Sequence, residues 1–237
     1  MNSFGNYETI SEKHSLEAAV TGFMTKVYGW MCCALFITAI TAWYVSGSEQ
    51  ILSFIFNNSA ALWILLIAEF GLVVAISAAI NKISAQTAIL LFVLYSLLTG
   101  ATLSIIFLVY TAESIATTFG LTGITFGIMS IYGLVTKKDL SSWGNILFMA
   151  LIGLILATVV NIFWASSTLY WITTYAGIII FVGLTAYDTQ KLRKLSLQIN
   201  PEESETYTKT AILGALTLYL DFINMFLYLL RLFGKRK

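Results

Sequence analysis

The sequence is poor in charged residues. Asp, Glu, Lys and Arg make up 11% of its 237 residues, whereas hydrophobic residues make up 58%. A soluble domain typically carries about 25% charged residues. A chain this apolar would expose large hydrophobic patches in water, and such patches drive association or insertion into a membrane. The composition therefore excludes an ordinary soluble domain and predicts an integral membrane protein that contacts the lipid bilayer.

Cysteine, histidine and proline are also scarce. The chain has two cysteines, one histidine (His14) and one proline (Pro201). Cys32 and Cys33 are adjacent in an apolar stretch, so we expect packing groups rather than a disulfide or a pair of metal ligands. The sequence has no Cys/His metal cluster, phosphate-binding glycine loop or serine-nucleophile motif. We therefore expect no cofactor and no enzymatic activity. The formal net charge of +1 gives no reason to expect a nucleic-acid partner.

The sequence instead contains long stretches without charged residues. A helix rises about 1.5 Å per residue, so about 20 apolar residues cross a hydrocarbon core roughly 30 Å thick. The longest run, 140–187, is long enough for two passes, with a break at the polar residues within 164–168. The runs are continuously apolar rather than alternating, which excludes a transmembrane β-barrel pattern. They predict an all-α membrane protein with seven transmembrane segments, at 27–45, 60–80, 88–110, 115–135, 143–163, 169–187 and 210–230.

Polar segments lie at both ends of this hydrophobic region. We expect residues 1–24 to form a polar cytoplasmic tail and residues 25–233 to form a single multi-pass transmembrane domain. Residues 234–237 are expected to form a basic carboxy-terminal tail.

The basic residues predict the orientation, because Lys and Arg stay on the cytoplasmic side. If the segments alternate across the bilayer, nine of the 13 Lys and Arg residues, all those up to Lys209, fall on the side of the amino terminus. The amino terminus is therefore expected inside. The four basic residues from Arg231 onward would lie outside after a seventh crossing. Segment 210–230 thus either crosses the bilayer and leaves these four basic residues outside, or enters the bilayer and returns to the cytoplasmic side. It contains no proline, which favours a continuous helix.

Three acidic residues lie in or directly after the predicted segments. Asp221 and Glu69 lie near the middle of theirs, and Asp188 directly follows another. A charged Asp at the bilayer centre costs about 2.5–3.5 kcal/mol on insertion scales, and acids at such depth are usually functional. We expect Asp221, Asp188 and Glu69 to form an ion-binding or proton-sensing site. The alternatives are a neutral, hydrogen-bonded Asp221, a protonated packing role for Glu69, and an interfacial Asp188 paired with Lys191.

Asp221 belongs to a stripe of polar and small residues. Residues spaced three and four apart share one face of a helix, and this stripe consists of Thr210, Gly214, Thr217, Asp221, Asn224 and Tyr228. On an otherwise apolar helix, such a stripe should face protein or water rather than lipid. We expect Thr217, Asn224 and Tyr228 to support the site at Asp221.

Two motifs resemble a known family. Residues 183–191, Gly-Leu-Thr-Ala-Tyr-Asp-Thr-Gln-Lys, are similar to the signature of the Bax inhibitor-1 family, and residues 214–224 resemble its final helix. The likeness runs through all the hydrophobic segments and is closest to the bacterial inner-membrane branch. It implies six helices around a central seventh, in a bacterial cytoplasmic membrane. It also implies a pH-sensitive calcium leak in which two aspartates, Asp188 and Asp221 by motif position, form a dyad.

The chemistry of such a dyad is reasonable. Two carboxyl groups a few ångströms apart cannot both ionise cheaply, so they share a proton and titrate as a unit. A protonated pair could hold two helices together, whereas an ionised pair could repel, open a path and offer oxygen ligands to Ca²⁺. Calcium prefers six to eight oxygens, so Asp188 and Asp221 alone would make a weak site, which suits conduction. Upright helices would leave about 10 Å between their depths. The pairing therefore follows from the resemblance and not from spacing.

Two other functions are alternatives to the calcium leak. The family includes modulators of a membrane protease and of stress or cell-death responses, which would act through helix–helix contacts. Gly120, Gly123 and Gly127 form a small-residue ridge that permits close helix approach, although packing within the bundle is the simpler explanation. An intramembrane aspartyl protease is disfavoured, because Asp221 follows Leu-Tyr-Leu rather than Gly-x-Gly.

Overall fold

The computed structural model describes residues 3–200 and 203–237, and the side chains of residues 1–15, including His14, lie outside this description. Within these ranges the regular structure is helical. The helices are α1 (Ser3–Ser46), α2 (Glu49–Phe56), α3 (Ser59–Ala79), α4 (Ala85–Leu103), α5 (Ile106–Val109), α6 (Ala112–Val135), α7 (Ser141–Trp164), α8 (Ser167–Ser196) and α9 (Ser204–Phe233).

Short polar residues mark where many helices begin. A side-chain oxygen before the first turn can accept a hydrogen bond from a backbone N–H that has no partner within the helix. Five helices begin this way, after Ser48, Asn58, Ser84, Thr111 and Ser166. The break predicted within 164–168 is the connection between α7 and α8, where Ala165 takes a left-handed conformation with φ of 47°.

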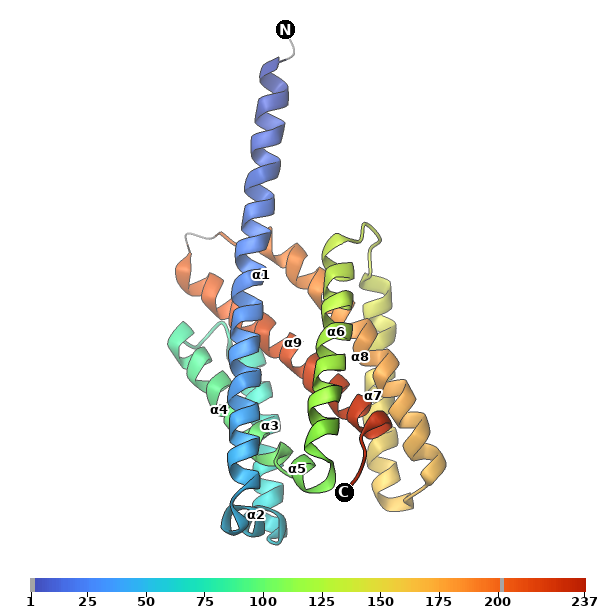
Figure 1. Cartoon of the computed structure of the whole chain (residues 1–237). Helices are drawn as coiled ribbons and strands as arrows, with labels where there is room; N and C mark the ends of the chain where they lie inside the picture. The colour runs from blue at the N-terminus through green and yellow to red at the C-terminus, as the bar shows by residue number, and fades with distance from the viewer. Residues whose placement is uncertain (1–2, 201–202) are drawn as a thin grey trace.

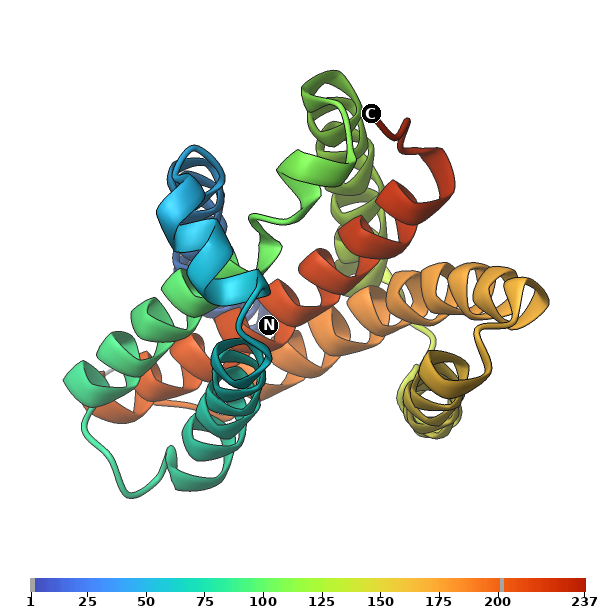
Figure 2. The ribbon, with the colours of Figure 1, turned by 90° about the horizontal axis from the view of Figure 1, so that it is seen from below.

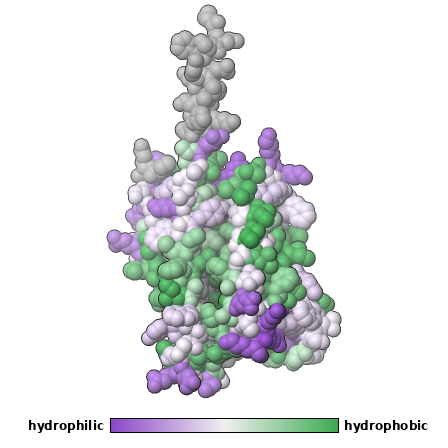
Figure 3. Space-filling view, in the orientation of Figure 1, coloured by the Kyte–Doolittle hydropathy of each residue, from purple (hydrophilic) through white to green (hydrophobic). Residues whose placement is uncertain are grey.

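Among the described residues, seven helical segments are long and apolar enough to cross a membrane: α1 from Leu16, α3, α4 together with α5, α6, α7, α8 and α9. On the face that Figure 3 shows, most of the surface between the two ends is apolar, and hydrophilic residues gather at the ends. The predicted all-α, seven-helix transmembrane bundle is therefore confirmed.

Helix α9 lies at the centre of the bundle. In its most apolar stretch 67% of residues are buried, against 6% in both α3 and α7. It packs against α8 and, in addition, against α1, α6, α4 and α3. The tilted pair α8 and α9 has α1 and α6 on one side and α3 and α7 on the other, and α7 packs against α8 (Figures 1 and 2). The arrangement of six helices around a central seventh is confirmed.

Two helices are longer than the apolar runs predict. α1 begins at Ser3 rather than near residue 27, so much of the expected polar tail is helical and projects beyond the bundle (Figure 1). α8 continues to Ser196, so Asp188 lies within a helix and not at its end. Hydropathy misses these extensions, because polar residues can continue a helix once it has left the apolar region.

The two chain termini lie at opposite ends of the bundle (Figure 1). α9 is one continuous helix that does not turn back. We name the end that carries the α3–α4, α6–α7 and α8–α9 connections the basic end. We name the opposite end, where the carboxy-terminal tail lies, the tail end (Figure 1). At the tail end, Arg236 forms an antiparallel backbone bridge with Tyr110. Of the two alternatives for segment 210–230, the structure has the spanning helix.

Candidate functional site

A cavity of about 770 Å³ lies between α3, α7, α8 and α9. Its volume falls within the roughly 300–1,000 Å³ common for ligand pockets. All three acids singled out in the sequence line it: Glu69 from α3, Asp188 from α8 and Asp221 from α9. We call it the acidic cavity.

The two aspartates are neighbours in the wall of this cavity. Asp188 is 9% exposed and Asp221 is 4% exposed, and their carboxyl groups lie within hydrogen-bonding reach of one another. Two carboxylates are both acceptors, so a hydrogen bond between them requires a proton. Asp221 Oδ2 is buried and receives no hydrogen bond from any other donor in the described residues. The pair is therefore suited to sharing one proton.

The tilt of the helices brings these two residues together. Upright helices would hold their Cα atoms at depths about 10 Å apart. In the structure α8 and α9 both cross the bundle obliquely and pack along one another (Figure 1). Packing against a tilted neighbour, which no hydropathy pattern records, thus determines the contact.

Glu69 lies across the cavity from the aspartates, on α3. Its Oε1 accepts a hydrogen bond from Thr102 Oγ1 of α4, so its hydrogen-bond partner is a hydroxyl and not an aspartate. The structure places Glu69 in the same cavity as the dyad but gives it a separate polar environment.

The predicted polar stripe divides into two parts. Thr217, Asn224 and Tyr228 line the cavity together with Asp221, whereas Gly214 is close to the Leu192 side chain of α8. Thr217 Oγ1 donates to the Leu213 carbonyl at 3.1 Å and Asn224 Nδ2 to the Leu220 carbonyl at 2.8 Å. These bonds stay within α9, so the polar wall does not depend on a partner helix for them.

Lys191 does not form the ion pair that was considered for Asp188. The described ion pairs within 4.0 Å are Lys194–Asp139 and Lys209–Glu205, and neither includes Lys191. Lys191 does line the acidic cavity, one helical turn from Asp188. Its positive charge is therefore close enough to act on Asp188 electrostatically without a direct contact.

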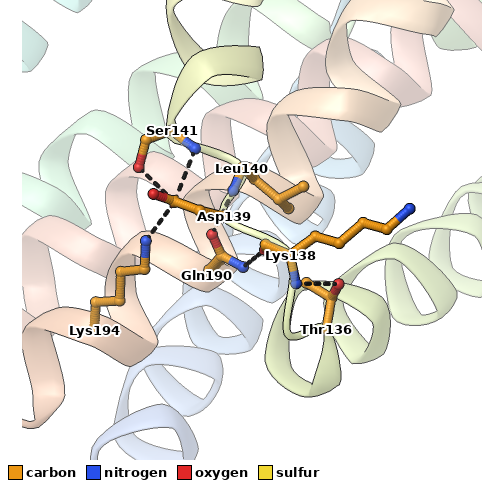
Figure 4. A network of polar contacts seen from close by, with 7 residues as sticks. All are labelled: Thr136, Lys138, Asp139, Leu140, Ser141, Gln190 and Lys194. Atoms are coloured by element: carbon orange, nitrogen blue, oxygen red, sulfur yellow. Dashed lines mark hydrogen bonds and ion pairs between the residues drawn. The ribbon is translucent and has the colours of Figure 1, made fainter.

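The signature motif also contains a residue that fixes the neighbouring connection. Gln190 Oε1 accepts a hydrogen bond from the Leu140 backbone N–H at 2.9 Å, and Gln190 Nε2 donates to the Lys138 carbonyl at 2.8 Å (Figure 4). Gln190 is 5% exposed. It ties the α6–α7 connection to α8 two residues after Asp188, a role that the sequence did not reveal.

Asp139 anchors the same connection from outside. Its Oδ1 lies 2.6 Å from Lys194 Nζ and accepts hydrogen bonds from the Ser141 backbone N–H and hydroxyl (Figure 4). The bond from Lys194, followed by those from Ser141, lowers the pKa of the Asp139 carboxyl to about 2. The side chain is exposed, so this is a solvent-screened contact.

A polar cluster on the opposite face of α9 is also not evident from the sequence. The Tyr219 hydroxyl lies 2.7 Å from Thr38 Oγ1, which donates to the Ser96 carbonyl at 3.0 Å. Tyr219 is fully buried, and its ring meets those of Phe92 and Tyr95 edge to face. The available signal was a tyrosine on an apolar helix face, since a buried hydroxyl needs a partner.

The glycine ridge of α6 is not used for packing within the bundle. In the described part of the chain, apart from the neighbouring backbone of α6 itself, no atom lies within 4 Å of the position that a Cβ would take at Gly120, Gly123 or Gly127. The close helix contact of α6 is instead made at Gly133, where a Cβ would meet the Ala186 backbone and the Thr189 side chain of α8. The expectation of internal packing for the ridge was therefore wrong.

The cavity offers oxygen ligands but no compact metal cage. No group of three or more His, Cys, Asp and Glu side chains suited to holding a metal ion is found among the described side chains, those of residues 16–200 and 203–237. The ligands present are the two aspartate carboxyls, with Glu69 across the cavity. A hard cation such as Ca²⁺ would find few of its preferred six to eight oxygens here, so binding would be weak.

Comparison with known proteins identifies the family of this chain. Residues 20–237 match the family described as inhibitor of apoptosis-promoting Bax1. The chain is 54% identical to the inner membrane protein YbhL of Escherichia coli K12, over 93% of this chain and 94% of that protein. It is 47% identical to an uncharacterised protein of Borreliella burgdorferi, over 91% and 92% of the two chains. It is 40% identical to the Rickettsia prowazekii protein RP147, over 97% and 96%. The chain therefore belongs to the Bax inhibitor-1 family.

Proposed function

We propose that the protein is a proton-regulated cation leak, with Ca²⁺ as the permeant ion, in a bacterial inner membrane. The observation that carries this proposal is the buried Asp188–Asp221 pair in the wall of the acidic cavity. Buried acids at membrane depth are costly and commonly mark ion or proton pathways. The inner-membrane location follows the name of the relative YbhL, with the amino terminus inside by the distribution of basic residues.

The pair would work as a proton-sensitive contact between α8 and α9. With one shared proton, the carboxyl groups hydrogen-bond and hold the two helices together. When that proton is lost, two negative charges face one another in a poorly solvated wall and repel. The helices then separate, and the exposed oxygens offer weak, exchangeable ligands to Ca²⁺.

Calcium efflux from proteoliposomes tests this directly. In the wild-type protein, efflux is expected to rise with increasing pH as the pair loses its shared proton. Asp188→Asn and Asp221→Asn should each flatten this dependence, because a single carboxyl has no acidic neighbour. Asp139→Asn, which removes an exposed carboxyl outside the cavity, is the matched control and should keep the wild-type profile.

Two results would contradict the proposal. If the pH dependence of efflux is unchanged in both Asp188→Asn and Asp221→Asn, the aspartate pair is not the proton sensor. Efflux that is absent under all conditions would remove the leak itself. The proposal assigns no catalytic role to the aspartates, so cleavage of a reconstituted helical substrate that is lost in Asp221→Asn would also contradict it.

One observation favours regulation of another membrane protein as a second function. α1 and α6 border an apolar groove of about 670 Å³, and Gly123 and Gly127 line it. Side-chain-free positions of this kind let a neighbouring helix approach closely. A pure regulator would conduct no ions in liposomes. It would instead lose its effect on a membrane protease when Gly123→Leu narrows the groove, whereas Asp221→Asn would leave that effect unchanged.

A further inference from the structure

The acidic cavity opens sideways, towards the surrounding lipid. α3 packs against α4 and α9, whereas α7 packs against α8. The two helices therefore stand apart on the same side of the central pair (Figure 2), and the cavity lies between them. In the described residues α3 and α7 make no extensive contact with one another, so direct packing of these two helices does not close the cavity on this side.

The rims of this opening are apolar and exposed. Phe70 of α3 is 72% exposed, and Phe148 and Ile155 of α7 are 59% and 54% exposed. All three line the cavity. Along α7 the lining runs from Gly144 to Val159, which is roughly 22 Å of helix. One leaflet of the hydrocarbon core is about 15 Å thick, so the slot is long enough for an extended acyl chain.

One end of the slot carries a positive charge. Lys191 and Asn145 line the cavity at the basic end of the bundle, and Lys191 has no ion pair within 4.0 Å in the described residues. The other charged groups facing the cavity are Asp188, Asp221 and Glu69 on its inner walls. A phosphate would be attracted to Lys191 and repelled by the acids, so a negative headgroup should stay at the slot end.

We propose that an anionic phospholipid of the bilayer binds here, with its phosphate at Lys191 and Asn145 and one acyl chain in the slot between α3 and α7. The chain covers the open side of the acidic cavity and keeps water and cations from entering it laterally. Binding does not depend on ion conduction. Only the expected effect on efflux rests on the proposed leak function.

Photo-crosslinking of the full-length protein tests the acyl-chain site. The protein is reconstituted in phosphatidylcholine vesicles that contain phosphatidylglycerol with a diazirine in its acyl chain, and labelled residues are mapped by mass spectrometry. Labelling should concentrate several-fold on Phe70, Phe148 and Ile155 relative to Ile152, which is exposed on α7 but does not line the cavity. Leu151→Trp should reduce labelling of the slot several-fold, and the matched Ile152→Trp should not.

Further variants keep the test informative. If Leu151→Trp fails to fold, Val73→Phe fills the slot from α3 and should have the same effect. Lys191→Gln should abolish preferential labelling by phosphatidylglycerol over a phosphatidylcholine probe, whereas Lys137→Gln, outside the cavity, should retain it. In efflux assays, Leu151→Trp should make the leak insensitive to added phosphatidylglycerol.

Uniform labelling around α7, or equal labelling by the two lipids, would overturn the proposal. Slot labelling in a protein that shows no efflux would support the lipid site and contradict only the leak function. The two proposals can therefore fail separately.

Discussion

Gln190 satisfies two backbone groups of the α6–α7 connection from a position on α8 next to the aspartate pair. Without the Gln190 side chain, the Leu140 N–H and the Lys138 carbonyl would lose these hydrogen bonds. A buried polar group that loses its partner costs about 1–3 kcal/mol. The glutamine of the signature motif thus acts through structure, by fixing the chain beside the site.

Gln190→Ala is expected to lower the free energy of unfolding by about 1–3 kcal/mol, because it leaves these two backbone groups unpaired. Thermal unfolding in detergent micelles measures the change. Gln198→Ala, at an exposed position beyond the end of α8, is the control and should change stability little. An equal effect of the two substitutions would contradict the role assigned to Gln190.

Asp139 gives the molecule a pH dependence outside the membrane. Its folded-state pKa of about 2 lies below the ordinary value of 3.8, so the folded state favours the ionised form. The stabilisation is therefore complete above about pH 4 and is lost as the pH falls through about 2. Asp139→Asn should lower the unfolding temperature near neutral pH, and the difference from wild type should vanish near pH 2.

Salt provides the control for this prediction. The Lys194–Asp139 pair is exposed, so about 0.5 M NaCl should shrink the difference between wild type and Asp139→Asn. A difference that persists unchanged at both low pH and high salt would contradict the electrostatic explanation.

At the scale of helices, glycines occur on two kinds of helix surface: surfaces in close contact with a neighbouring helix, and surfaces that border an open groove. Gly133 lets α6 approach α8, and Gly100 lets α4 approach α1 at Thr38. Gly127 belongs to the same helix as Gly133 but borders the groove beside α1. The sequence presents these glycines alike, and only the placement of the neighbouring helices distinguishes them.

Gly133→Ala should therefore destabilise the protein by about 1–3 kcal/mol, because its methyl group would collide with the α8 backbone. The methyl group of Gly127→Ala would meet no atom of another described element within 4 Å, and the substitution should stabilise the protein by up to about 1 kcal/mol through higher helix propensity. Chemical or thermal unfolding of the two variants makes the comparison. Similar losses in both would show that the ridge is packed after all.

The carboxy-terminal tail joins two distant elements at the tail end. The Thr111 N–H donates to the Lys235 carbonyl at 3.1 Å, and the Lys237 N–H donates to the Val109 carbonyl at 3.0 Å. Removal of residues 235–237 should speed amide hydrogen exchange at 106–114, because these backbone partners are lost. Exchange at 183–191, which the tail does not contact in these bonds, should stay unchanged and serves as the internal reference.

At the scale of the whole molecule, seven spans, an odd number, predict that the two termini lie on opposite sides of the membrane. In a variant with Cys32 and Cys33 replaced by serine, Lys237→Cys should react with a membrane-impermeant maleimide added to intact cells. Lys82→Cys, at the basic end, should react only after the cells are opened. The reverse pattern would contradict the orientation predicted from the basic residues.

The sequence by itself determined the helices and the family. A bilayer core of fixed thickness demands about 20 apolar residues per crossing, so uncharged runs predict spans without knowledge of their neighbours. Asp221 and Glu69 are also recognisable from the sequence as candidate functional residues, because a charge deep in the bilayer core is costly. Residues 183–191 added the resemblance to a family that the comparisons confirmed.

Only the tertiary structure decided how these helices meet. The tilt of α8 and α9 closes the depth difference between Asp188 and Asp221, and the position of α3 brings Glu69 to the same cavity. α3 and α7 stand apart on one side of the central pair (Figure 2), and the exposed side chains of Phe70 and Phe148 line the cavity between them. Helix tilt and neighbour choice arise from side-chain packing between segments far apart in the chain, and hydropathy along one segment carries no record of them.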